Sequence, residues 1–131
     1  MSSVLARRTG RKRGYPMKAA VVISACTLVC LDSAGLAISA SAAGGTDKLV
    51  GLAPMQADNT DGIDKALTIE VEHDELLLLN AGDVSDADVG SKAYLSASNT
   101  VSISHATNTR PIAGTITQMD GGKVWVKPEV V

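Results

Sequence analysis

The sequence is a succession of short apolar runs separated by residues that favour turns. The clearest run is Leu67–Glu72, in which Leu67, Ile69 and Val71 alternate with polar residues. In a β-strand, successive side chains point to opposite faces of the sheet. The alternation therefore predicts a strand with these three apolar side chains turned inward.

The last third of the chain contains four further runs at regular spacing. Each is short and bounded by Asn, Asp, Gly or Pro, as strands are. They are Lys92–Leu95, Thr100–Ser104, Ile112–Gln118 and Lys123–Lys127. Ahead of them, Ser85–Asp88 predicts a short helical turn capped by Ser85 or Asp83. Strands at this spacing, with little amphipathic helix, predict an all-β protein that forms a small β-barrel or β-sandwich.

Two runs in the middle of the chain fit the same interpretation. Leu49–Ala57 is a strand candidate that Pro54 interrupts, because proline lacks the N–H that a central strand needs. Leu76–Leu79 follows the turn residues His73 and Asp74 and is closed by Asn80 and the glycine that follows soon after it. We therefore expect strands here as well.

The uncharged run Ala19–Leu31 has two interpretations. It follows a basic segment, and Ala40–Ala42 resembles a cleavage site, so residues 1–42 have the outline of a cleaved secretory signal. The run is also rich in Val, Ile and Thr, and it ends in the turn sequence Asp32–Gly35 before a second apolar run. We expect a β-hairpin here; a secreted or periplasmic β-domain with a cleaved leader is the alternative.

The core has to be aliphatic, because the 131 residues include no Phe, one Trp and two Tyr. The length is near the common domain size, and residues 17–131 are predicted to form a single β-rich domain. Cys26 and Cys30 would lie about 13 Å apart on one face of a strand, beyond disulfide reach. We interpret both as reduced core residues, so an oxidising compartment is not required.

Positive charge is concentrated at the N-terminus. Of the 12 Lys and Arg, six fall within the first 18 residues, and all 14 Asp and Glu come later. Residues 1–16 also carry Gly10, Gly14 and Pro16, a composition that predicts an extended basic arm on an acidic body. The arm residues expected to contact a partner are Arg7, Arg8, Arg11, Lys12, Arg13 and Tyr15.

Three roles are open to this arm. We rank first an acidic protein surface, where Arg donates forked hydrogen bonds to carboxylates. A solubilising tail without a partner comes second. Nucleic acid comes third: phosphates attract positive charge with little sequence-specific structure, but only Tyr15 is close enough to the Arg cluster to stack on a base.

The polar residues assemble no recognisable chemistry. The spacing of Asp83, Asp86 and Asp88 is not that of a calcium-binding loop, so we interpret them as turn and cap residues. The segment His73–Glu75 matches no metal-site spacing, and His105 lies in a different predicted loop. Ser and Thr abound without an elbow motif that would expose a nucleophile. The sequence predicts no catalytic, cofactor-binding or metal site, and hence no enzyme and no small-molecule substrate.

Four segments carry a resemblance to a known family. They are KAAVVISACTLVCLDSAGL (18–36), DADVGSKAYL (86–95), RPIAG (110–114) and GGKVWV (121–126). In this order and spacing the chain resembles the small capsid decoration, or cement, proteins of tailed bacteriophages and prophages. Two segments depart from the pattern: Ser24–Cys26 stands where a Gly is expected in the first hairpin, and His73–Glu75 replaces a Gly-containing turn.

The resemblance implies a structural protein without enzymatic activity or cofactor, made in the host cytoplasm and located on the outer capsid surface of the virion. It implies contact with the major capsid protein and a homotrimer over local three-fold positions, with no membrane partner. The basic arm would then lie across adjacent capsid subunits and stabilise the head by clamping them. Many weak contacts of this kind become collectively strong on a repeating surface.

Overall fold

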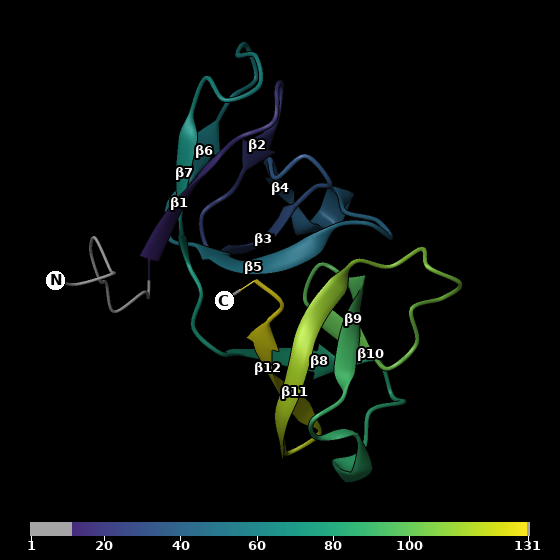
Figure 1. The fold of residues 1–131 in the computed structure, drawn as a ribbon. Coiled ribbons are helices and arrows are strands. Elements are labelled where there is room, and N and C mark those ends of the chain that lie inside the picture. Colours follow the sequence, from purple (N-terminus) through teal and green to yellow (C-terminus); the bar gives the residue numbers. More distant parts are fainter. Residues whose placement is uncertain (1–11, 131) are drawn as a thin grey trace, which may run out of the picture.

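The computed structural model describes residues 12–130, and nearly all of its regular structure is β (Figure 1). Ten strands belong to one mixed sheet, and a separate two-stranded sheet pairs β2 (Val22–Ile23) with β6 (Ala57–Asp58). Two short 3-10 helices, η1 (Ala40–Ala42) and η2 (Asp86–Asp88), lie between strands. The prediction of an all-β fold is confirmed.

The first half of the large sheet curls into a small barrel, which we call the N-terminal barrel. Its strands pair in the order β1, β7, β5, β3, β4, all antiparallel. A bridge between Met17 and Ala37 joins the end of β1 to β4 and closes the ring. The strands are β1 (Lys12–Pro16), β3 (Thr27–Leu31), β4 (Ala37–Ser39), β5 (Lys48–Ala53) and β7 (Thr68–Glu72).

The second half forms the C-terminal barrel, in which every strand pairs with two neighbours. The order is β11, β12, β8, β10, β9 and back to β11, with β8 and β10 parallel. The strands are β8 (Leu76–Asn80), β9 (Lys92–Ala97), β10 (Thr100–Ser102), β11 (Ile112–Asp120) and β12 (Lys123–Pro128). One parallel pair, Ile112 with Lys48, joins the two barrels through β11 and β5.

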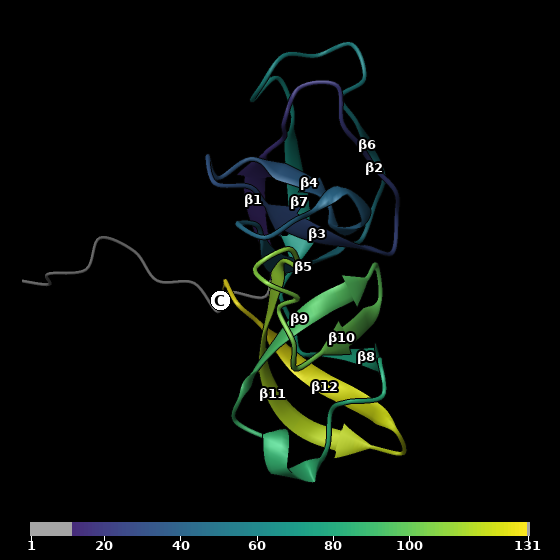
Figure 2. The same cartoon turned by 90° about the vertical axis from the view of Figure 1, so that its right-hand side faces the viewer.

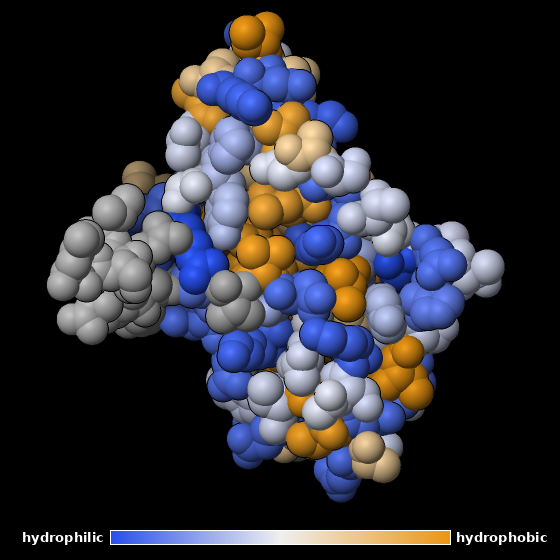
Figure 3. Space-filling view, viewed as in Figure 1, coloured by the Kyte–Doolittle hydropathy of each residue, from blue (hydrophilic) through white to orange (hydrophobic). Residues whose placement is uncertain are grey.

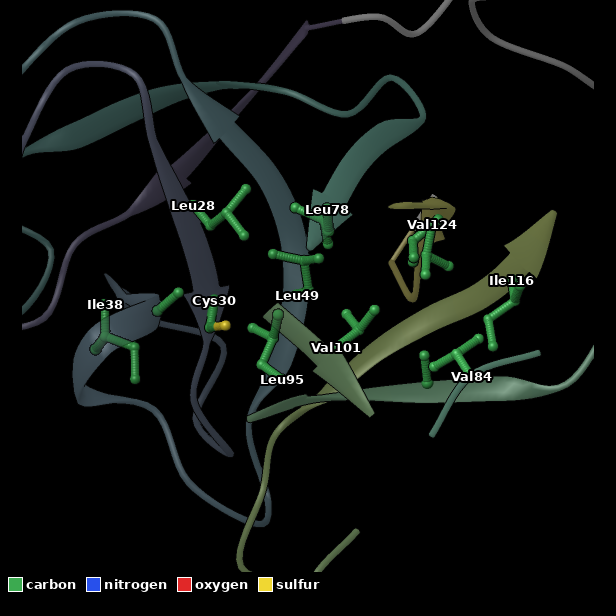
Figure 4. Packing of buried hydrophobic residues seen from close by; sticks show 14 residues of the cluster. Leu28, Cys30, Ile38, Leu49, Leu78, Val84, Leu95, Val101, Ile116 and Val124 are labelled. Carbon is green, nitrogen blue, oxygen red and sulfur yellow. The ribbon is translucent and has the colours of Figure 1, made fainter. Parts of the chain in front are cut away.

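The N-terminal barrel has its own aliphatic core, and a second cluster is shared between the two barrels. Met17, Ile23, Val29, Val50 and Val71 are among the residues that fill the N-terminal barrel. The shared cluster fills the C-terminal barrel and extends into the junction, where Figure 4 shows side chains of both halves. The N-terminal barrel contributes Leu28, Cys30, Ile38, Ala40 and Leu49 to it.

Burial on both faces explains the unbroken apolar runs of β3 and β5. In β3, Val29 points into the N-terminal core while Leu28 and Cys30 belong to the shared cluster. Strands buried on both faces are expected to be apolar throughout rather than alternating. The run Ala19–Leu31 therefore contains a strand at the centre of the molecule, and the predicted hairpin is confirmed by β3, Asp32–Gly35 and β4.

Several sequence-based expectations are corrected. Residues 12–16 of the predicted arm form β1, a strand of the N-terminal barrel, so this part of the predicted arm belongs to the β-rich body. Leu67 is 40% exposed, because it precedes β7 and only Ile69 and Val71 of the alternating run point inward. Cys26 is exposed in the turn before β3, so only Cys30 is a core residue.

Candidate functional site

The residues predicted to bind a partner fall into two groups. Arg7, Arg8 and Arg11 lie outside the described residues. Lys12, Arg13 and Tyr15 lie on β1, which pairs with β7 across Lys12–Glu72 to Pro16–Thr68. Strand geometry therefore separates these three side chains between the two faces of the sheet.

Lys12 is the side chain of β1 that stays available at the surface. Its Nζ lies 3.9 Å from Glu70 Oε1, and both side chains are more than half exposed. A solvated pair of this kind contributes little stability, so the ammonium group can exchange partners. Tyr15 instead packs partly buried against the N-terminal core, opposite Ile69. Only part of the Tyr15 ring is therefore accessible for the predicted contact with a partner.

The Arg13 side chain is less exposed than that of Lys12 but keeps some of its donors accessible. It is half-buried opposite Val71, and its Nε is shielded from solvent without a hydrogen-bond acceptor among the described residues. A guanidinium carries five N–H donors in a planar fork, so the buried Nε leaves other donors for a carboxylate. Arg13 and Lys12 are thus the described part of the predicted basic surface.

The carboxylates of the 83–88 segment have structural partners. Asp88 Oδ2 accepts hydrogen bonds from Ser85 N at 2.8 Å and Ser85 Oγ at 3.2 Å, which fixes the start of η2. This confirms the helical turn, with Ser85 rather than Asp83 at the N-cap. Asp83 Oδ2 instead accepts a 2.5 Å hydrogen bond from the buried Ser102 Oγ. Within residues 12–130, no group of three or more His, Cys, Asp or Glu could hold a metal ion.

The two histidines lie in different elements. His73 is half-buried in the link between β7 and β8. His105 Nδ1 accepts a hydrogen bond from Asn108 N at 2.9 Å, and its ring stands edge-on to Tyr94 with centroids 5.6 Å apart. These contacts hold the loop before β11, in which Ala106, Thr107 and Asn108 all have positive φ. His105 therefore stabilises this loop of the C-terminal barrel.

A cleft of about 960 Å³ lies at the junction of the barrels, and no local sequence pattern indicates it. Elements from both halves of the chain line it, including β2 of the two-stranded sheet and β8 of the C-terminal barrel, which lie on the same side of the molecule in Figure 2. Its lining includes Leu28, Leu52 and Ile38 from one barrel and Leu76–Leu78 from the other, with serines and alanines between them. Among the described residues that line it, Lys18 alone has an ionised side chain, and its Nζ lies 3.9 Å from Asp32 Oδ2. The cleft is more apolar than polar and carries little charge.

The two thiols lie in different environments, one in the cleft and one in the core. Cys26 is exposed, lines the cleft and has a φ of 60°. This is the turn in which the family resemblance leads one to expect Gly, the residue that adopts positive φ most readily. Cys30 is fully buried, and burial, with a smaller contribution from the negative charge of Asp47, raises its pKa from 9.0 to about 12. Only Cys26 is positioned to react with a reagent in solution.

Comparisons with family models, with curated proteins and with solved structures find no match to this chain. Among the described residues, no helix has the length and apolar character needed to cross a bilayer.

Proposed function

We propose that this chain is a structural capsid decoration protein of a tailed bacteriophage or prophage, which binds the outside of the assembled head and stabilises it. The observation that carries the proposal is where the resembling segments fall. Residues 86–95, 110–114 and 121–126 supply η2, much of β9, the entry to β11 and most of β12. These three of the four segments belong to one structural unit, the C-terminal barrel, and the fourth, residues 18–36, supplies β2, β3 and the turn before β4.

The resembling residues also have specific structural roles. Gly114 has a φ of 143°, and a Cβ there would lie 1.9 Å from the Lys127 carbonyl oxygen, so only glycine fits. Trp125 Nε1 donates a hydrogen bond to Asp120 Oδ2 at 3.2 Å and ties β12 to the last residue of β11 near the hairpin turn. Ala93, Val124 and Val126 are fully buried. The resembling segments thus include several residues that the fold of this barrel constrains.

The basic N-terminus supplies the proposed contact with the capsid. Arg7, Arg8 and Arg11 precede Lys12 and Arg13, whose side chains begin the described surface on β1. Guanidinium groups bind carboxylates bidentately, so an acidic patch on the major capsid protein is the expected partner surface. A homotrimer would bring three such arms to one local three-fold position and multiply their individual affinities.

Undecorated heads assembled from the major capsid protein of the same phage provide the test. The full chain is expected to co-sediment with heads and to raise the temperature at which they disassemble. A variant lacking residues 1–11 leaves β1 in place, whereas a longer deletion would also remove part of the barrel. We expect this variant, and the triple variant Arg7→Gln, Arg8→Gln, Arg11→Gln, to bind far more weakly.

The matched control neutralises the same kind of charge on the other barrel. Lys123 and Lys127 are exposed on β12, so Lys123→Gln with Lys127→Gln changes a similar charge without touching the arm. This double variant is expected to keep full occupancy. Undiminished occupancy of the variant lacking residues 1–11 would refute the arm contact, and failure of the full chain to bind heads would refute the decoration role.

A further inference from the structure

The cleft between the barrels has large aliphatic side chains on both walls. Val22 on β2 and Leu77 on β8 line it and remain 42% and 41% exposed. Its volume of about 960 Å³ is at the upper end of the range of about 300–1,000 Å³ that is usual for ligand sites. Exposed aliphatic side chains in a concave site indicate a surface that a binding partner covers.

The wall formed by β8 also has an open strand edge. Leu79 N donates to Asn99 O at 2.9 Å, on the side of β8 that faces β10. Two residues further on, Ala81 N donates to Val101 O on the same side. Backbone groups alternate in direction along a strand, so those of Leu77 also point away from β12. The pairing of β10 covers only the last two residues of β8, and no described strand pairs with Leu77 on that side.

The neighbouring chain turns away where this edge begins. Ser98 and Asn99 form the turn between β9 and β10, and both line the cleft. A strand added beside Leu77 would therefore continue the line of β10 along β8. The opposite wall is similar, because β2 pairs with β6 alone among the described strands. Open edges of this kind accept an extended peptide through main-chain hydrogen bonds.

The chemistry of the cleft favours an uncharged peptide over other occupants. Asp32 lies 3.9 Å from the Nζ of Lys18, so a charged ligand would find no free counter-charge among the described lining residues. Burial of an unpaired charge is costly. An apolar small molecule would leave the Leu77 N–H and C=O without partners, whereas an extended peptide supplies both an acceptor and a donor. The described strands of a second copy are already paired within their own sheets.

We propose that the cleft binds an extended, uncharged segment of a partner protein, which adds to β8 beside Leu77 as a β-strand. The aliphatic side chains of the segment would pack against those of the cleft, and small side chains such as Ser39 and Ser41 leave room for them. Because both halves of the chain line the cleft, the bound segment would contact both. The inference concerns the body of the protein and does not depend on the capsid role.

Disulfide tethering to Cys26 tests the proposal with a defined probe. Cys26 is exposed and lines the cleft, whereas Cys30 is buried. The probe is the peptide acetyl-Val-Thr-Val-Thr-Cys-amide, supplied as its mixed disulfide with 2-mercaptoethanol. The Cys26 thiolate attacks the peptide sulfur, forms the new disulfide and releases 2-mercaptoethanol as its thiolate, so no oxidant is needed. Intact mass gives the concentration of added 2-mercaptoethanol at which half of the protein still carries the probe.

Comparison probes separate main-chain pairing from apolar contact. Alternate amides of an extended strand face the same edge, so N-methylation of one set or of the other gives two isomers that differ in pairing. One isomer is expected to be released at about one-tenth of the 2-mercaptoethanol concentration that releases the other, because it loses main-chain hydrogen bonds. Equal retention of the two isomers would overturn the proposal. Hexanethiol retained as firmly as the unmodified peptide would also overturn it and assign the cleft to an apolar small molecule.

Two leucines of β8 provide a matched pair of protein variants. Leu77 lines the cleft and Leu79 does not, yet both lie on the same face of the strand and are 41% and 46% exposed. Leu77→Asp is expected to reduce retention of the probe about tenfold, since it places a charge beside the aliphatic side chains of the peptide. Leu79→Asp should retain the probe as the wild-type chain does. Equal effects of the two substitutions would contradict the site.

Hydrogen exchange of the Leu77 amide reports the added strand directly. In the free chain this amide should exchange quickly, whereas the Leu79 amide, bonded to Asn99 O, should exchange slowly. Tethering of the probe is expected to slow exchange at Leu77 about tenfold and to leave Leu79 unchanged. Protection of Leu77 in the free chain, or fast exchange in the tethered chain, would overturn the proposal. A dimer in sedimentation velocity that tethering dissociates would overturn it as well, because the cleft would then be occupied by a second copy.

Discussion

The two barrels are both small, but they differ in how completely their strands pair. In the C-terminal barrel each strand has two strand neighbours, and β11 extends over nine residues. In the N-terminal barrel, β1 and β4 meet only through the Met17–Ala37 bridge, and β4 has three residues. Backbone pairing therefore specifies the C-terminal barrel more fully, and the N-terminal barrel depends more on its apolar core and on its neighbour.

The two halves also differ in how far their large apolar side chains are exposed. The most exposed large apolar residues, Met55 at 73% and Ile63 at 77%, lie in the connections on either side of β6 in the N-terminal half. In Figure 3 apolar side chains are also visible near the end of the molecule that carries the β6–β7 connection. A protein assembled on a repeating surface would place this end, the basic strand β1 and the cleft toward its partners. The C-terminal barrel would serve as the rigid base.

Glycine substitutions, one in each barrel, give the largest expected effects on stability. Gly51 on β5 and Gly114 on β11 both lie beside a register shift and have φ values of 152° and 143°. A Cβ would lie 2.2 Å from Glu72 O at Gly51 and 1.9 Å from Lys127 O at Gly114. Backbone strain and overpacking together should cost about 3–5 kcal/mol for either change to Ala.

The measurement is urea unfolding followed by circular dichroism, which reports both barrels. Gly82→Ala is the control, because Gly82 also has positive φ, at 117°, but open space where a Cβ would lie. Its cost should be about 1 kcal/mol. We expect Gly114→Ala to destabilise more than Gly51→Ala, since it lies in the fully paired barrel. The reverse order would contradict the view that the C-terminal barrel is the rigid base.

Truncation of Leu49 tests whether the barrels unfold together. Leu49 lies on β5 of the N-terminal barrel, yet it is fully buried in the shared cluster. Leu49→Ala should cost about 3 kcal/mol, because a large-to-small change leaves a cavity where both halves meet. Met17→Ala should cost a similar amount within the N-terminal core alone.

Fluorescence of Trp125, the only tryptophan, reports the C-terminal barrel, and circular dichroism reports the whole chain. If the shared cluster couples the barrels, Met17→Ala shifts the fluorescence transition as far as the dichroism transition. Separate transitions in the Met17→Ala variant would show two independent units. Wild-type transitions that coincide provide the reference.

The same contrast explains how much the sequence could predict. The C-terminal strands alternate or are bounded by turn residues, so their number and order could be inferred, although β11 extends to Asp120 and β10 ends at Ser102. In the N-terminal half, β3 and β5 are buried on both faces, and this removes the alternation that identifies a strand. β1 could not be predicted, because Lys12–Pro16 has no apolar pattern and because its pairing with β7 depends on residues that are distant in the sequence. Closure of the ring at Met17 and the cleft are likewise tertiary features.

The charge of the candidate site could be predicted from the sequence, but the position of its residues in the fold could not. The cluster of arginines and lysines is evident in the sequence, and Lys12 does lie at the surface. No local pattern indicates that Tyr15 turns toward a core or that Cys26 and Leu77 border one cleft. These juxtapositions arise from strand pairings between residues far apart in sequence.

The smallest predicted effect concerns pH and the shared cluster. Burial raises the pKa of Cys30 from 9.0 to about 12, so the folded chain keeps the thiol protonated after the unfolded chain has begun to lose its proton. The stability from the neutral thiol is fully present below pH 9.0 and is lost as the pH rises toward about 12. At pH 10 the free energy of unfolding should be lower by about 1 kcal/mol on this account.

Other groups also titrate in this range, so the measurement compares variants. Cys30→Ala starts less stable at pH 8 because it loses core contacts, but it lacks the thiol-dependent decline. The difference in unfolding free energy between the wild-type chain and Cys30→Ala should therefore shrink between pH 8 and pH 10, whereas Cys26→Ala, at the exposed thiol, should follow the wild-type curve. A constant difference would show that the Cys30 proton does not contribute to the pH dependence of stability. It would also show that water reaches Cys30 at the junction, where the shared cluster places an apolar contact.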